Sequence, residues 1–243
     1  MKAAPRLDAL AATLARLAAG AACDADLQEV LLCVLDTLAV GHAARDSVVV
    51  RKLADAQSGG DGPADSALLM ATTAHVLDYD DVQMSSVCHA SAVILPALLA
   101  VRQRWPGGDF AAAFQAGLRT IAAMGRLFGP RHYMAGWHAT ATLGPFGAAA
   151  AIVRLADGDA SALRQALALA ACQASGMQRS FGTDAKPLQA GLAASAGVRA
   201  ALWALAGLSG GDVLEPRGFL QLYGAGEGRA TTVEEAVAPA LQD

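Results

Sequence analysis

The chain has 243 residues, enough for one large domain, and charged residues make up only 16% of it, against about 25% in an ordinary globular protein. Its net charge is −4 and it has no basic stripe, so we expect no nucleic-acid partner. Aromatic residues amount to 5% of the chain, and packing must therefore depend on small and aliphatic side chains. The low charge content also predicts a homodimer, because helical surface without charge needs an apolar neighbour.

Helical patterns follow one another along the whole chain. Near the N-terminus, leucines recur every three or four residues on one helix face, at Leu7, Leu10, Leu14 and Leu17. Residues 27–40 have so few polar interruptions that they predict a helix buried on most sides. Further helices are expected at residues 45–56, 65–78, 91–104, 109–127, 139–156, 161–178 and 187–207, with Asp65 or Ser66, Asp109 and Ser161 as N-caps.

These helices predict a single domain of the all-α class. Breaks rich in glycine and proline separate them, and no stretch alternates polar and apolar residues for long enough to require a strand. We expect the multi-helix domain to cover residues 1–223 and a short polar tail to follow at residues 224–243.

Two stretches and the cysteines bear on the cellular compartment. Residues 84–101 carry no Asp, Glu, Lys or Arg, but three serines, His89 and Pro96 make them a poor membrane span. Near the N-terminus, Asp8 and Arg16 interrupt any signal-peptide core. The four cysteines have no paired spacing, which is typical of idle thiols in a reducing compartment. We therefore expect a cytoplasmic protein with no membrane partner.

Three polar segments interrupt this apolar sequence. In the first, the acidic cluster Asp78-Tyr-Asp-Asp81 is followed eight residues later by His89, which precedes an apolar helix. A solvated turn is the simpler interpretation of an acidic cluster alone. Carboxylates beside an imidazole, however, also form an acid–base unit, in which the carboxylate fixes the tautomer of the ring and raises its basicity.

The second and third segments supply another imidazole and an ammonium group. His138 precedes a helix of small residues, where it is either a capping or core residue or part of an anion site. Lys186 is one of three lysines and stands before Pro187 at the expected start of a helix, with Thr183 or Asp184 as cap. It forms either a surface salt bridge with Asp184 or, at the edge of an uncharged region, a site for a substrate carboxylate.

No pattern in the chain predicts a metal or a cofactor. The spacings His75/His89 and His132-x5-His138 match no zinc motif, and the cysteines form no pair. A glycine-rich phosphate loop and a GxSxG elbow are both absent from the sequence, which argues against nucleotide binding and serine hydrolysis. We therefore expect no cofactor and no metal, and a site of His, Asp and Lys side chains for a small anionic molecule.

Four segments together resemble the MmgE/PrpD family, which includes 2-methylcitrate dehydratase and cis-aconitate decarboxylase. They are AHVLDYDD at residues 74–81, HASAVILPALLA at 89–100, GWHATATLGPFGAAAA at 136–151 and GTDAKPLQAG at 182–191. A fifth segment, VLEPRGF at residues 213–219, looks like another part of the family pattern. The segments follow the family's order over most of the chain, and in combination they are specific.

The resemblance implies a helical domain, usually dimeric, with metal-free lyase or isomerase chemistry on small di- or tricarboxylates. It implies catalytic roles for Asp78, His89, His138 and Lys186 and substrate-binding roles for Lys186, Asp81 and Gln189. One histidine would move the proton at the carbon next to a carboxylate. Asp78 would orient and polarise that imidazole, and Lys186 would neutralise the substrate carboxylate.

The chain also departs from the family pattern. Val82 stands where the family has Thr, HPS has become His89-Ala-Ser91, and Gln189 replaces the histidine of KPLH. Family members are nearly twice this long and carry an α/β lid domain, which we expect to be absent here. Two functions therefore stay open. One is a carboxylate lyase, complete alone or completed by a lid-bearing partner chain; the other is a lidless, non-catalytic module for carboxylate binding or dimerisation.

Overall fold

The computed structural model describes residues 6–19, 24–223 and 232–237, and within these ranges every regular element is a helix. The all-α prediction is therefore confirmed. The α-helices are α1 (Leu7–Ala18), α2 (Asp24–Ala44), α3 (Val48–Ala56), α4 (Pro63–His75), α5 (Ser91–Val101), α6 (Phe110–Phe128), α7 (Pro130–Met134), α8 (Ala139–Leu155), α9 (Ala160–Ala171), α10 (Ala185–Leu205), α11 (Phe219–Tyr223) and α12 (Val233–Val237). Two 3-10 turns occupy Arg102–Arg104 and Gln178–Ser180.

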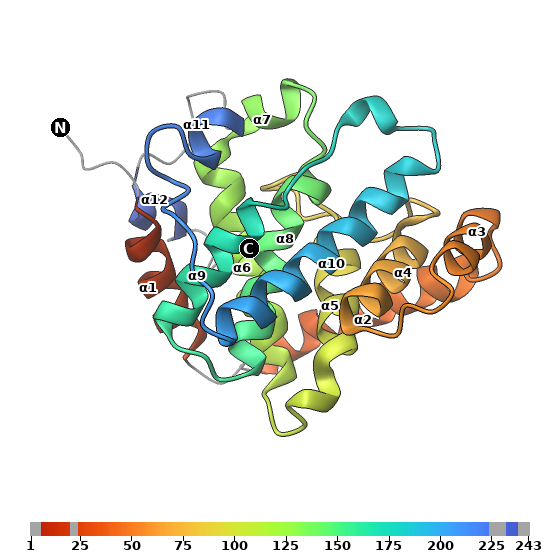
Figure 1. Cartoon of the computed structure of the whole chain (residues 1–243), viewed down its shortest axis with the longest axis horizontal. Coiled ribbons are helices and arrows are strands. Elements are labelled where there is room, and N and C mark those ends of the chain that lie inside the picture. The colour runs from red at the N-terminus through yellow and green to blue at the C-terminus, as the bar shows by residue number, and fades with distance from the viewer. Residues whose placement is uncertain (1–5, 20–23, 224–231, 238–243) are drawn as a thin grey trace.

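Helix α8 forms the centre of the core. All of its residues are buried except Arg154, because it consists mostly of alanine, glycine and aliphatic residues and has no polar face. It packs against α10, α6, α5 and α9. Figure 1 shows α10 crossing the front of the molecule, with α2, α3 and α4 on one side and α1, α11 and α12 on the other.

Small residues let α10 approach its neighbours closely. A Cβ added at Gly191 would lie 2.1 Å from Thr72 Oγ1 of α4, and one at Gly197 would lie 2.3 Å from Ala148 Cβ of α8. No side chain larger than hydrogen fits at these contacts without movement of a helix. This packing matters for function, because α10 and α4 both carry residues of the site described below.

Most predicted helices form, but some of their ends are wrong. Asp109 is confirmed as an N-cap, since its side chain accepts a hydrogen bond from Ala112 N at 3.0 Å. The caps predicted at Asp65 or Ser66 and at Ser161 are wrong. Helix α4 begins earlier, at Pro63, and Asp159 caps α9. Helix α9 also stops at Ala171, short of the predicted residue 178.

The early end of α9 has a tertiary cause. Gly176 adopts a positive φ of 153°, and its carbonyl accepts a hydrogen bond from His138 N at 3.1 Å. Met177 pairs with Trp137 in an isolated antiparallel bridge. The chain thus leaves the helix in order to fasten the start of α8, a contact distant in sequence that local propensity does not reveal.

The prediction that residues 27–40 are buried on most sides is wrong. Helix α2 exposes a row of leucines, namely Leu27, Leu31, Leu32, Leu35 and Leu38, at 45–68% of their surface. By length and composition residues 27–44 would suffice to cross a membrane, and only 17% of this stretch is buried. Such a helix, near the N-terminus of the chain, is weak evidence for a membrane protein.

Part of the predicted tail lies outside the described residues, namely 224–231 and 238–243. Between them α12 packs on α6 and α1 and buries Val233, Ala236 and Val237.

Candidate active site

The first part of the site is the turn that follows α4. The helix ends at His75, and Asp78 then adopts a left-handed conformation with φ of 58°. An aspartate tolerates this conformation better than most residues, because its short polar side chain interacts with the nearby backbone. The turn brings Asp78 and Asp80 back beside the end of α4, so that residues close in sequence form one compact group.

Asp80 joins two histidines inside the protein. Its Oδ2 atom lies 2.8 Å from His75 Nδ1 and 3.1 Å from His89 Nδ1, and the side chains of His75 and Asp80 are fully buried. Burial acts to raise the pKa of Asp80, but the hydrogen bonds from the two imidazoles outweigh it and hold the pKa well below its usual range. Asp80 is therefore an anion that two N–H groups share.

His89 lies between the two carboxylates. Its Nε2 atom is 3.6 Å from Asp78 Oδ1, while its Nδ1 atom also meets the Asp80 carbonyl at 3.0 Å. Burial acts to lower the pKa of His89, but the hydrogen bond and charge of Asp80 overcome it, and the pKa is raised. The backbone amide of His89 is fixed by Thr140 Oγ1 of α8 at 3.0 Å.

Lys186 enters from the start of α10 and binds Asp78 through its ammonium group. Its side chain is only 12% exposed, whereas that of Asp78 is 53% exposed, so the pair lies at the opening of the cluster. Burial acts to raise the pKa of Asp78, but Lys186 outweighs it and the pKa is lowered. The ammonium also lies 5.6 Å from the centre of the Phe181 ring.

His138, at the N-terminus of α8, completes the cluster. Its Nδ1 atom lies 2.8 Å from Gln189 Oε1, and the Gln189 amide donates to Met177 O at 3.3 Å. Because that donor fixes the amide orientation, Oε1 must accept from His138 Nδ1–H, and the neutral form of the ring therefore carries no proton at Nε2. Burial lowers the pKa of His138 to about 4, so this ring is neutral near pH 7.

Of the residues expected at the site, the structure brings together Asp78, His89, His138, Lys186 and Gln189. The carboxylate of Asp81 makes its hydrogen bond elsewhere, with Ser91 Oγ at 2.6 Å, and the Asp81 amide donates to Asp36 of α2. Burial raises the pKa of Asp81. This residue therefore ties the turn to α2 and α5.

The sequence interpretation missed two members of the cluster, His75 and Asp80. Sequence reasoning assigned the orienting carboxylate to Asp78, whereas the atom that meets His89 Nδ1 belongs to Asp80. His75 lies between the two other rings, with centroids 4.5 Å from His89 and 5.9 Å from His138. The available signal was the spacing of five residues between His75 and Asp80 across a helix end.

The side chains of the cluster include groups that can bind a metal ion. Ligand-type atoms of His75, Asp78, Asp80 and His89 lie within 4.8 Å of one another. The Asp80 carboxylate already accepts hydrogen bonds from both imidazoles, and the Lys186 ammonium occupies Asp78. A cation would have to displace these partners, so the arrangement fits acid–base chemistry better than metal binding.

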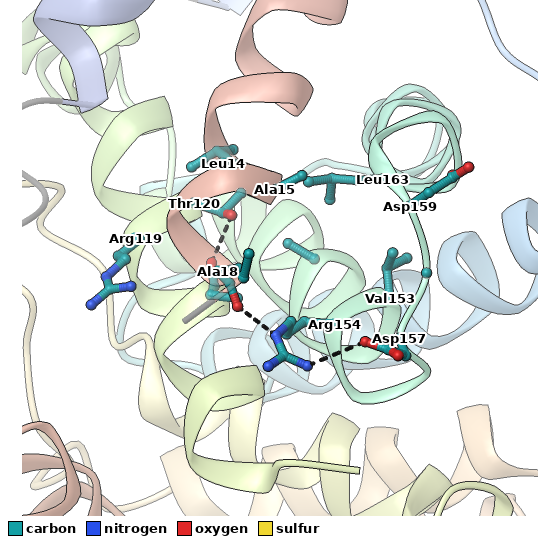
Figure 2. A pocket seen from close by; sticks show the side chains of 14 residues that line it. Leu14, Ala15, Ala18, Arg119, Thr120, Val153, Arg154, Asp157, Asp159 and Leu163 are labelled. Atoms are coloured by element: carbon teal, nitrogen blue, oxygen red, sulfur yellow. Dashed lines mark hydrogen bonds and ion pairs between the residues drawn. The ribbon is translucent and has the colours of Figure 1, made fainter. Parts of the chain in front are cut away.

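A separate cavity of about 270 Å³ lies between the end of α1 and helices α6 and α8, and Figure 2 shows its lining. Its cationic groups already have partners. Arg154 Nε donates to Ala18 O at 2.6 Å, and Arg119 donates to Leu17 O at 3.1 Å. These arginines satisfy carbonyls at the C-terminus of α1, a structural role that leaves the histidine cluster as the stronger candidate.

Comparisons with known proteins place the chain in a family. A cis-aconitate decarboxylase of Homo sapiens is 30% identical over 162 residues, which cover 61% of this chain and 32% of the relative, and that of Mus musculus gives the same figures. A cis-aconitate decarboxylase of Aspergillus terreus is 27% identical over 186 residues, covering 72% of this chain and 38% of the relative. The chain thus spans about a third of the length of these curated relatives.

The MmgE/PrpD N-terminal domain, as a family model, matches residues 8–231. That range includes every residue of the cluster, from His75 to Gln189. With helical architecture and sequence match in agreement, the chain belongs to the MmgE/PrpD family.

Proposed function

We propose that this chain carries the acid–base site of a lyase or isomerase that acts on a small di- or tricarboxylate. The observation that supports it most is the cluster itself, in which three imidazoles, a buried carboxylate and an ammonium come together. These groups come from the end of α4, the turn after it, the residues just before α5, and the starts of α8 and α10. The names of the matched relatives, cis-aconitate decarboxylases, favour a tricarboxylate as substrate.

Lys186 is the proposed anchor for a substrate carboxylate. It is the cation at the opening of the cluster, and Asp78 holds it there without burying it completely. A carboxylate that reaches the ammonium gains a charge-assisted hydrogen bond. When a proton leaves the neighbouring carbon, negative charge spreads onto that carboxylate, and the fixed ammonium then stabilises it further.

The two flanking histidines are suited to opposite proton transfers. The environment lowers the pKa of His138 and raises that of His89, a separation typical of base and acid assignments. In a dehydration, His138 Nε2 would take the proton from carbon while His89 gives a proton to the departing hydroxyl, which leaves as water. In a decarboxylation, loss of CO2 would leave a carbanion that a histidine protonates.

The proposed test is turnover followed by NMR in D2O with cis-aconitate, 2-methylcitrate and related acids, with and without a lid-bearing homologue. We expect consumption of one acid. A decarboxylation or epimerisation should leave deuterium at the carbon that is protonated, whereas a dehydration should give an unsaturated product with no new C–H bond. His138→Asn keeps a donor towards Gln189 but removes Nε2, and should lower kcat by about 10²- to 10⁴-fold. Lys52→Met removes an exposed lysine outside the cluster and is the matched control.

Absence of turnover with every acid, alone and with the homologue, would contradict the lyase proposal. If an acid nevertheless binds and Lys186→Met abolishes the binding, the non-catalytic carboxylate-binding alternative would hold instead.

We further propose that a second copy of the chain covers the exposed leucines of α2. The helix carries four acidic residues and no Lys or Arg between residues 24 and 44, which disfavours an anionic lipid surface as the partner. Light scattering should give about twice the chain mass of 24.6 kDa, and Leu32→Glu should give the monomer. Leu208→Glu, at an exposed leucine outside α2, is the control. A monomeric wild type, or flotation with lipid vesicles, would contradict the proposal.

A further inference from the structure

His75 is the most deeply buried of the three rings in the cluster. Its side chain is fully buried, and it lies behind His89, whose side chain is 16% exposed. Its Nδ1 atom lies 2.8 Å and 3.1 Å from the two oxygens of Asp80. Its Nε2 atom is buried and has no hydrogen-bond partner among the described residues. The hydrogen bond to Asp80 is therefore the polar interaction that compensates for the burial of the His75 imidazole.

The shared carboxylate determines which nitrogen of each ring carries a proton. An ionised carboxylate only accepts hydrogen bonds, so both Nδ1 atoms that face Asp80 must donate. For His89, a proton fixed at Nδ1 leaves Nε2 as the atom that gains and loses protons. That atom faces Asp78 at 3.6 Å, on the side where Lys186 lies. His75 thus affects His89 without contacting the reacting atoms.

His75 also lies between the rings of His89 and His138, to which the proposed function assigns the proton transfers. Its centroid is 4.5 Å from that of His89 and 5.9 Å from that of His138, with which it is stacked at 20°. A ring in this place keeps the two outer imidazoles apart and limits their rotation.

The charges around His75 are compatible with a neutral ring. It faces the anionic Asp80 on one side and the imidazole of His89 on the other, with His138 and the ammonium of Lys186 beyond. Burial is the main cause that lowers the pKa of His75. A neutral His75 donates a hydrogen bond without adding a positive charge that would compete with His89 for Asp80.

We propose that His75 is a positioning residue, which acts through Asp80 to hold His89 in the orientation and tautomer needed for proton transfer. The proposal deepens the proposed lyase function, on which its kinetic part rests. Its structural part concerns the His89 ring alone and is measurable without any substrate.

The test compares His75→Leu with His75→Asn. Leucine has a similar bulk but no donor, whereas the asparagine amide places an N–H near the position of Nδ1. We expect His75→Leu to lower kcat by about 10- to 100-fold with KM changed less than about threefold, and His75→Asn to keep most of the activity. In ¹⁵N NMR of labelled histidines, the Nδ1 proton of His89 should persist in the wild type and His75→Asn. It should be lost in His75→Leu, because Asp80 without its second donor can turn away from His89.

The two readouts separate this proposal from the lyase proposal. If the wild type turns over an acid but His75→Leu keeps its kcat and the His89 tautomer, the positioning role is refuted and the lyase function stands. If no acid is turned over, the NMR result alone decides the positioning role. Should His75→Leu fail to fold, loss of the His89 Nδ1 proton in folded His75→Asn would still overturn the proposal.

Discussion

The substitution Asp80→Asn tests the core of the cluster, because Asp80 is the carboxylate that two imidazoles share. Asparagine has nearly the same shape, but its amide offers one acceptor and one N–H donor in place of two acceptors. One of the two Nδ1–H groups, on His75 or His89, would then face another donor. That ring must change its tautomer or rotate away.

The size of the effect follows from the burial and the two short contacts. The Asp80 side chain is fully buried, at 2.8 Å and 3.1 Å from the two Nδ1 atoms. Hydrogen bonds to a charged group are worth about 1.5–3 kcal/mol each, and Asn keeps one in a weaker, neutral form. We therefore expect a loss of roughly 2–4 kcal/mol, which in a domain of this size lowers Tm by roughly 5–15 °C.

The pH dependence of this loss has a defined direction. The pKa of Asp80 is depressed in the folded state, so its contribution is complete above its ordinary value of about 3.9 and is lost as the pH falls towards the folded value. The pKa of His89 is raised, so its share is complete below about 6.5 and is lost as the pH rises through the folded value. The difference between wild type and Asp80→Asn should be largest between about pH 4 and 6.5.

Thermal unfolding of both proteins from pH 3.5 to 9 measures this difference. Asp184→Asn is the control, because Asp184 forms an exposed ion pair with Lys52 at 3.3 Å and should change stability by less than about 1 kcal/mol. A Tm difference for Asp80→Asn below 2 °C, or one independent of pH, would refute the account of the shared carboxylate.

Three further predictions concern packing, strain and metal dependence. Gly191→Ala should lower Tm by several degrees and weaken activity, because its Cβ would lie 2.1 Å from Thr72 Oγ1 and 2.5 Å from Leu68 O. The control is Gly107→Ala, which has open space around it and should change neither Tm nor activity. Val87→Asn should raise the free energy of unfolding by about 1 kcal/mol in urea titrations, since a β-branched residue is strained at φ of 53°. An unchanged or lower free energy of unfolding would show that Val87 is not strained. Dialysis against EDTA should leave turnover unchanged, and activity restored only by an added metal would overturn the metal-free mechanism.

The helices were predictable wherever local patterns control them. The leucines of α1 lie on one face as expected, with Leu7, Leu10 and Leu14 buried, and Asp109 caps α6 through a local hydrogen bond. The exposure of α2 was not predictable in the same way, because an apolar helix looks the same whether it packs in a core or faces outward.

The candidate site, too, was predictable from the sequence only in part. Family motifs and the rarity of ionisable groups indicated His89, His138 and Lys186, and the structure brings all three together with Asp78. The roles of the carboxylates required coordinates. Asp78, Asp80 and Asp81 lie within four residues, and only the left-handed turn at Asp78 determines which one faces Lys186, the imidazoles or Ser91.

The central claim is that this cluster separates an acid from a base around a carboxylate site, and ¹⁵N NMR titration of the histidine rings tests it most directly. With and without cis-aconitate, the account predicts that His138 stays neutral down to about pH 4, that His89 titrates above 6.5, and that both respond to the ligand. Titration of both rings together near 6.5, with no response to any small carboxylate, would contradict it.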